Sequence, residues 1–330
     1  MRLVISGVFA LALVACSSSD SKEVASGGGA GGAVTGGSGG TPTGGSAGTA
    51  SGGAPSGGGS AGTAGASSGG AAGSGGGGGD CSPTNWPTAQ TVGIPSGTPT
   101  LKVIGGSSVH TQADGEVFDA VELQARLYVD HQNVVIKRSK LIGDQYYAIY
   151  TTVPEAHLTI EDSEIVGGVL ITDYFVGRRN HLHAASGGTK DDGYIFSASH
   201  VLLEDNLIDG LVGDTGAHLD GIQVMGGTDV VIRHNWIEAV SPPISGGGVN
   251  AAVFFKPDFD PISDVTVECN MLIEKDGYYP LRIDAGGTNV VRHNRWEKGH
   301  LGAAVLLSGS TTVAVWEDNQ YTDGEVIAAP

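Results

Sequence analysis

The chain has 330 residues, of which 56 are glycine, and its formal net charge is −18. Only 17 lysines and arginines oppose 35 aspartates and glutamates, which argues against nucleic acid or an anionic membrane surface as a partner. An acidic polysaccharide is still allowed, because a groove can be locally basic or can hold calcium.

The first fifteen residues are typical of a bacterial export signal. Arg2 precedes the apolar run 3–14, which is shorter than the roughly 20 residues of a membrane-spanning helix. The run ends in Leu13-Val-Ala-Cys16, which resembles the lipobox of bacterial lipoproteins, and the resemblance implies that Cys16 is lipidated. Serines follow the cysteine, as in lipoproteins sent to the outer membrane. We therefore expect an exported lipoprotein at the bacterial outer membrane or cell surface, held in the membrane only by its lipid.

Residues 16–80 form a linker made almost wholly of glycine, serine, alanine and threonine. Such a composition lacks the apolar surface needed to offset the entropy of ordering, so it predicts a disordered tether. The folded part is expected at 81–330, as one domain. It contains Cys81 and Cys269, for which an exported setting permits a disulfide, although a buried thiol inside the repeat fits Cys269 equally well.

From residue 133 onward one short phrase recurs, in which apolar residues alternate with polar ones and the phrase ends in Asn or Ser. Asn133-Val-Val-Ile-Lys-Arg-Ser139 and Asp229-Val-Val-Ile-Arg-His-Asn235 are two clear copies. Alternation with a period of two predicts half-buried strands, and a spacing of about 25 residues predicts a stacked repeat. The terminal positions are Ser139, Ser163, Asn180, Asn206, Asn235, Asn270, Asn294 and Asn319.

These repeats resemble the parallel β-helix proteins that include pectate lyases, alginate lyases and polygalacturonases. The resemblance implies an all-β fold, namely a right-handed single-stranded parallel β-helix of about eight coils in residues 81–330. In that family an asparagine at the turn after a strand stacks on its neighbours as an internal ladder. The positions that match it are Asn206, Asn235, Asn270 and Asn294.

The candidate chemistry comes from strands that precede the repeated phrase. Counting back from Asn206 and Asn235 places Asp192-Gly one coil from Asp220-Gly, so the two aspartates should stack. In the segment that ends at Gln223, His218 and Asp220 share one face of a strand. A histidine beside a carboxylate can act as a base near neutral pH, so we expect both to be catalytic and Gln223 to bind substrate.

Later coils supply two cations to the same predicted wall. Lys256 follows an apolar strand, where desolvation lowers an amine's pKa, and Arg282 could clamp a carboxylate with two hydrogen bonds. Both are expected to be catalytic. Asp284 and His183 are expected to bind substrate. Carboxylate oxygens suit calcium, and the expected calcium ligands are Asp191, Asp192 and Asp214.

Three functions fit these residues. A lyase acting on a uronate polysaccharide needs a base and a cation that neutralises the sugar carboxylate, and the candidates can supply both. A polygalacturonase-like hydrolase is a second alternative, although stacked Asp192 and Asp220 would lie too close together for inverting hydrolysis. The third is a tethered β-helix that binds a glycan or another cell without catalysis. The expected partner is an acidic polysaccharide, and we expect a monomer.

Overall fold

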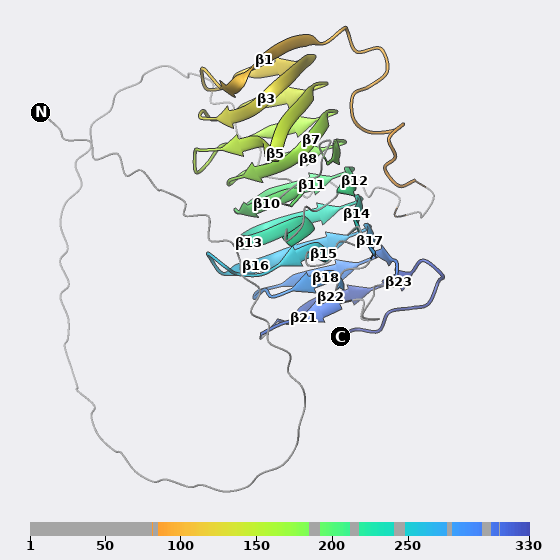
Figure 1. Ribbon diagram of the computed structural model, residues 1–330. Helices are drawn as coiled ribbons and strands as arrows, with labels where there is room; N and C mark the ends of the chain where they lie inside the picture. The colour runs from red at the N-terminus through yellow and green to blue at the C-terminus, as the bar shows by residue number, and fades with distance from the viewer. Residues whose placement is uncertain are drawn as a thin grey trace, which may run out of the picture. The chain divides into compact units, whose positions relative to one another are not determined.

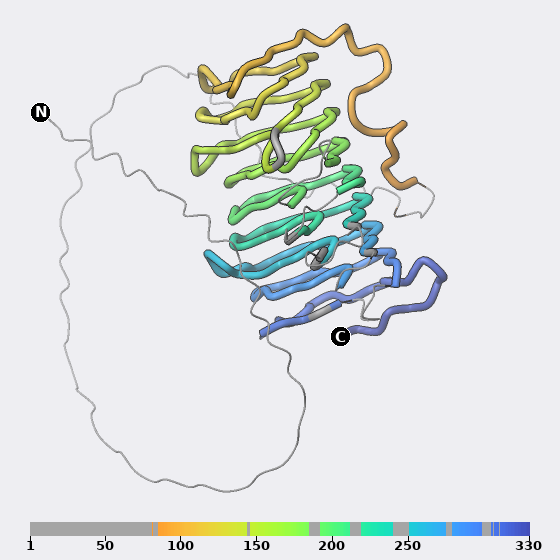
Figure 2. Tube along the Cα trace, viewed as in Figure 1, coloured from red at the N-terminus to blue at the C-terminus, as the bar shows by residue number. Residues whose placement is uncertain are grey.

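The computed structural model describes residues 81, 85–184, 192–211, 218–240, 248–275, 279–298, 305–309 and 311–330. The predicted signal peptide, Cys16 and the linker lie outside the described residues. Within the described ranges all regular structure is β, and no helix there is long and apolar enough to cross a membrane. Figures 1 and 2 show the chain winding in stacked coils from β1 (Lys102–His110) to the C-terminal strands.

Each coil contributes to three faces, and strands of successive coils pair in parallel. The first face contains short strands that, except for β2 (Val117–Asp119), end just before the repeated Asn or Ser; β2 ends just before Val121 at the equivalent position. They are β2, β4 (Val135–Lys137), β6 (Thr159–Glu161), β8 (Val176–Arg178), β11 (Val201–Glu204), the end of β13 (His218–Arg233), β16 (Ile262–Glu268), β19 (Asn289–Arg292) and β22 (Val313–Glu317).

The second face contains the strands that follow those residues. They are the first parts of β1, β3 (Val121–Val129), β5 (Lys140–Thr151) and β7 (Glu164–Ile171), then β9 (His181–His183), β12 (Leu207–Leu211), β14 (Trp236–Val240), β17 (Met271–Lys275), β20 (Arg295–Trp296) and β23 (Gln320–Tyr321).

The third face closes the coil. It consists of the last parts of β1, β3, β5 and β7, then β10 (Tyr194–Ser197), the start of β13, β15 (Gly248–Phe255), β18 (Tyr279–Ile283) and β21 (Val305–Leu307). The parallel β-helix of about eight coils predicted from the sequence is confirmed.

A continuous hydrogen-bond ladder runs through the interior at the repeated Asn and Ser positions. The side-chain oxygen of Asn235 accepts the backbone N–H of Asn206 at 2.9 Å, and that of Asn270 accepts the backbone N–H of Asn235 at 3.0 Å. The Asn235 amide also donates to the Leu203 carbonyl at 2.9 Å. All four predicted ladder asparagines are fully buried, and the same contacts continue through Ser139, Ser163, Asn180, Asn294 and Asn319.

The ladder holds a sharp turn in every coil. The residue before each ladder position has a left-handed backbone, although none of these residues is glycine. Their φ angles run from 46° at Asp318 to 58° at His293. Such a conformation costs a non-glycine residue free energy and persists only where neighbouring contacts fix it. Here the contacts are the buried amides of the ladder.

On the outside of the first face, charge alternates from coil to coil. The residue two positions before each ladder residue is acidic in one coil and basic in the next, which allows ion pairs such as Arg178 to Glu204 at 2.9 Å and Arg292 to Glu268 at 2.7 Å. The alternation favours the native stacking register, since a slip of one coil would place like charges together. The column consists of Asp119, Lys137, Glu161, Arg178, Glu204, Arg233, Glu268, Arg292 and Glu317.

The segment before β1 runs back along the stack. Cys81 forms a disulfide with Cys269, and the two Cα atoms are 5.1 Å apart. Of the two alternatives that the sequence left open for Cys269, a disulfide or a buried free thiol, the structure has the disulfide. Trp86 packs against Met271 and Ile273, and the Gly93 N–H donates to the Arg179 carbonyl at 2.8 Å. The segment thus joins late coils to middle ones before the chain enters β1.

Replacing Cys81 by serine should lower the free energy of unfolding by about 2–4 kcal/mol, because the bridge closes a long loop in the unfolded chain. The bridged cysteines are 188 residues apart in sequence. Urea unfolding with and without a reducing agent measures the effect. The reductant should lower the wild-type stability to that of Cys81→Ser and leave the variant unchanged; an equal loss in both proteins would contradict the prediction.

Candidate functional site

Asp192 and Asp220 stack on adjacent coils, as the count along the sequence predicted, but both lie inside the structure. The Asp220 backbone N–H donates to Asp192 Oδ1 at 2.5 Å, and the Ala251 N–H donates to Asp220 Oδ1 at 2.8 Å. These are the contacts that the asparagine ladder makes. With exposed fractions of 1% and 0%, the two aspartates form a second, short internal ladder, and their placement gives both carboxyls a structural role.

The four predicted catalytic residues are spread along the strands. Asp220 is in register with Ala251, whereas Lys256 lies five residues further along that chain segment, about 16 Å away at the usual strand rise. The backbone of His218 is in register with Gly248, further still from Lys256. The structure therefore does not gather these residues at one point.

Gln223 and Arg282 do share an outward column of the third face. Both are in register with Phe254, which lies between them, and the Arg282 guanidinium carbon is 4.8 Å from the centre of the Phe254 ring. Lys256 lies two positions beyond Phe254, and its Nζ is 3.1 Å from Asp258 Oδ1. The predicted wall of Gln223, Lys256 and Arg282 is thus formed only in part.

The remaining predicted residues are dispersed. Asp284 is half-buried against the turn at Gly309. Asp191 and Asp214 lie outside the described residues. In the part of the chain that the structure describes, no group of three or more His, Cys, Asp or Glu residues could hold a metal ion. The calcium site therefore stays a prediction.

His183 lies on the second face in a row of charged groups. Its Nε2 is 3.2 Å from Glu164 Oε1, and Lys140 Nζ donates to the same oxygen at 2.7 Å. The hydrogen bonds from His183 and Lys140 lower the pKa of Glu164 to about 2, against the opposing effect of burial. The hydrogen bond to Glu164 in turn raises the pKa of His183.

An aromatic surface covers the third face in the first coils. The outward side chains of His110, Tyr128 and Tyr150 are in register on consecutive coils. The His110 and Tyr128 rings stack with centroids 4.7 Å apart, and the Tyr150 ring lies 5.7 Å from that of Tyr128. All three side chains reach solvent.

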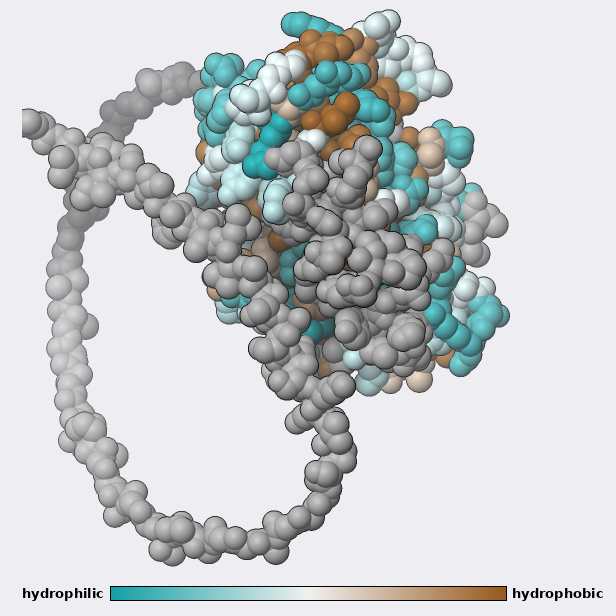
Figure 3. Space-filling view, in the orientation of Figure 1, coloured by the Kyte–Doolittle hydropathy of each residue, from teal (hydrophilic) through white to brown (hydrophobic). Residues whose placement is uncertain are grey.

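An arginine and one further exposed tyrosine complete this surface, and a buried tyrosine, Tyr147, packs against them. The Arg126 guanidinium carbon lies 6.0 Å from the Tyr128 ring centre and 5.9 Å from that of Tyr147. Tyr147 contacts Tyr150 edge-on, and Tyr146, which is 41% exposed, lies next to it. The tyrosine–arginine surface is therefore defined by His110, Arg126, Tyr128, Tyr146 and Tyr150, and the buried Tyr147 supports it. Figure 3 shows hydrophobic and hydrophilic residues interleaved over the first coils, at the top of the view.

Replacing Glu164 by glutamine should destabilise the protein by about 1 kcal/mol in a defined pH window. The lowered pKa of Glu164 gives stability that is present above its ordinary value of 4.5 and lost as the pH falls toward 2. The raised pKa of His183 gives stability that is present below 6.5 and lost as the pH rises through the folded value.

Melting temperatures of the two proteins from pH 3 to 9 test this: the difference should be largest near pH 5–6 and shrink on both sides. A difference that does not change with pH would contradict the pairing.

The comparisons with known proteins agree with this architecture. Residues 126–257 match the family model described as a right handed beta helix region. No curated protein and no solved structure matches the chain. Together with the parallel pairing of successive coils, the family match identifies the fold as a right-handed parallel β-helix.

Proposed function

We propose that this protein is an exported, lipid-anchored β-helix that binds an acidic polysaccharide through its tyrosine–arginine surface. The observation that supports the proposal is the cluster of Arg126 with the outward-facing Tyr128 and Tyr150 on the first coils, which packs against the buried Tyr147. Tyrosine and arginine, together with tryptophan, are enriched in the hot spots of protein interfaces.

The stacking of the rings determines what they offer to a ligand. Because His110 and Tyr128 stack face to face, they present ring edges and polar atoms to solvent rather than open ring faces. The Arg126 guanidinium carbon lies within 6.0 Å of the Tyr128 and Tyr147 ring centres and brings a positive charge to this surface. A row of hydroxyl groups beside a guanidinium suits a chain of sugars that carry carboxylates.

The direction of the row also fits a polymer. The aligned side chains follow one another along the helix axis at the spacing of neighbouring strands, about 4.8 Å. A linear polysaccharide lying along the axis can therefore repeat the same contact on successive coils. Since each single contact is weak, the affinity of the surface would come from their number.

Uronate lyase activity is the second candidate, and one observation favours it. Arg282 is half-buried, and within the described part of the chain its Nε has no hydrogen-bond partner, so its guanidinium is the candidate group for neutralising a sugar carboxylate. Arg282 is in register with Phe254 on the neighbouring coil. Lys256 follows Phe254 by two residues and is the candidate base. The proposed lyase reaction does not use Asp220, because the Asp220 carboxyl belongs to the internal ladder.

Replacing Arg126 by alanine should weaken binding to a polyuronide about tenfold, since a hydrogen bond to a charged group is lost. Affinity electrophoresis of the purified protein in gels containing polygalacturonate, alginate or neutral dextran measures the effect. Retardation should occur in a polyuronide and not in dextran, and added salt should reduce it. Arg126→Lys should recover part of the binding.

Arg292→Ala is the matched control, because it removes the same charge from the first face, where Arg292 pairs with Glu268. Equal weakening in both variants, or retardation in dextran alone, would contradict the proposal.

The lyase candidate is tested by incubating the protein with polyuronides and measuring the ultraviolet absorbance of unsaturated ends. Product that disappears in Lys256→Ala with Arg282→Ala would support the lyase, and binding without product would exclude it for these polymers.

A further inference from the structure

One histidine of the tyrosine–arginine surface is fixed from two sides. The His110 ring stacks on that of Tyr128, with centroids 4.7 Å apart and 8° between the ring planes, and His110 Nδ1 is 2.6 Å from Asp130 Oδ2. Arg126 reaches the same tyrosine, since its Nη1 donates to Tyr128 Oη at 3.4 Å. A group that gains and loses a proton and a group with a permanent positive charge therefore meet at one ring.

The Asp130 carboxylate is held on both of its oxygens. Oδ2 contacts His110, and Oδ1 accepts the hydroxyl of Thr152 from the next coil at 2.6 Å. Burial opposes ionisation of this carboxyl, but the hydrogen bonds from Thr152 and His110 outweigh it and lower the pKa of Asp130. Because an ionised carboxylate only accepts hydrogen bonds, Nδ1 of His110 carries a proton whether the ring is neutral or charged.

The other ring nitrogen of His110 is therefore the one that changes. The side chain is 50% exposed, and within the described residues Nε2 has no hydrogen-bond partner. In the neutral ring Nε2 presents a lone pair, which repels a carboxylate oxygen, whereas in the charged ring it is a donor that binds one. Histidine is the side chain that ordinarily changes charge between about pH 5 and 8.

The charge of the surface depends on this proton. The elements packed against His110 are β3 with the turn after it and the loop after β1, and their charged or titratable groups are Arg126, Asp130, His131, Asp114 and Glu116. The last two accept backbone N–H groups at 2.9 and 2.6 Å. Since Arg126 carries +1 and Asp130 −1, the group around the Tyr128 ring has no net charge while His110 is neutral and is positive once His110 is protonated.

We infer that the tyrosine–arginine surface binds its acidic polysaccharide through protonated His110, so that binding is tight in mild acid and weak in mild alkali. The inference rests on the proposed function and adds its regulation. Polyuronide carboxylates stay ionised over this range, because ordinary carboxyl groups lose their protons near about pH 4. The charge of His110 therefore decides the affinity, and Asp130 is the positioning residue that holds Nδ1 and leaves Nε2 to the ligand.

Calorimetric titration of the full chain with polygalacturonate at one ionic strength, at about pH 5.5 and about pH 8, tests this inference. The wild type should bind about tenfold more tightly at the lower pH, since a charged hydrogen bond replaces a repulsive contact. His110→Gln should bind as weakly at both pH values as the wild type does at the higher one. Asp130→Asn removes the charge that offsets Arg126, so it should bind more tightly than the wild type at the higher pH and depend less on pH.

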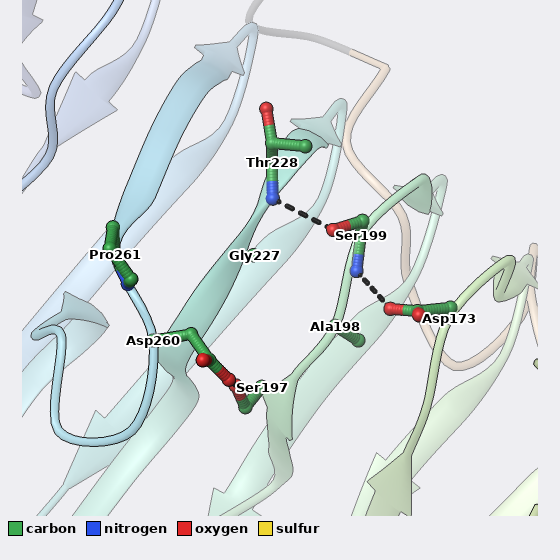
Figure 4. Close-up of a pocket in the computed structure, with 8 residues that line it drawn as sticks. All are labelled: Asp173, Ser197, Ala198, Ser199, Gly227, Thr228, Asp260 and Pro261. Carbon is green, nitrogen blue, oxygen red and sulfur yellow. Dashed lines mark hydrogen bonds between the residues drawn. The ribbon is translucent and has the colours of Figure 1, made fainter. Parts of the chain in front are cut away.

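His200→Gln is the matched control, because His200 has the same two kinds of contact. Its Nδ1 lies 2.9 Å from Asp229 Oδ2, and its ring stacks on that of Tyr174 with centroids 4.6 Å apart. It follows Ser199, at the turn that Figure 4 shows, several coils along the stack from His110. This variant should keep the pH dependence of the wild type.

Three outcomes would overturn the inference. Wild-type binding that is equal at the two pH values, and that Arg126→Ala still weakens, would reject it while the proposed function stands. A pH dependence that persists in His110→Gln, or that His200→Gln removes to the same extent, would assign the effect to the charge of the whole chain. Absence of binding at both pH values would reject the proposed function and this inference with it.

Discussion

The structure depends on one repeated interaction, the hydrogen bond that a buried Asn or Ser side-chain oxygen accepts from the backbone N–H of the preceding coil. At Asn235 the side-chain oxygen accepts from Asn206, and the amide donates to Leu203. Inside a dry core, each of these backbone groups would otherwise lack a partner, at a cost of about 1–3 kcal/mol. The ladder therefore makes the left-handed turns possible, and those turns set the rotation of every coil.

Because each coil has the same turn at the same place, outward side chains line up from coil to coil. This alignment produces the alternating charges on the first face and the aromatic row that includes Tyr128 and Tyr150. The first column favours the native register. The second leaves aromatic rings at the surface beside Arg126, and it is where polysaccharide binding is proposed.

The sequence predicted the fold well because the ladder is local: each phrase carries its own strand, turn and asparagine. It also placed Asp192 beside Asp220 correctly. It did not predict that these carboxyls lie inside, because the register shifts between Leu219 and Asp220, and a shift changes which face a side chain occupies. The tyrosine–arginine surface could not be predicted, because residues 102–129, which include Arg126 and Tyr128, lack the repeated phrase that relates one coil to the next. Pairing of Cys81 with Cys269 depends on a segment that runs against the stack, which no local pattern reveals.

The most direct test of this account compares two variants only two residues apart. Asn235→Ala removes a ladder amide, whereas Arg233→Ala removes an outward ion pair with Glu204. In urea unfolding the account predicts a loss of about 3 kcal/mol or more for Asn235→Ala, because several buried backbone groups lose their partners. It predicts a loss of about 1 kcal/mol or less for Arg233→Ala. Equal losses, or a larger loss for Arg233→Ala, would contradict the claim that the internal ladder sets the structure.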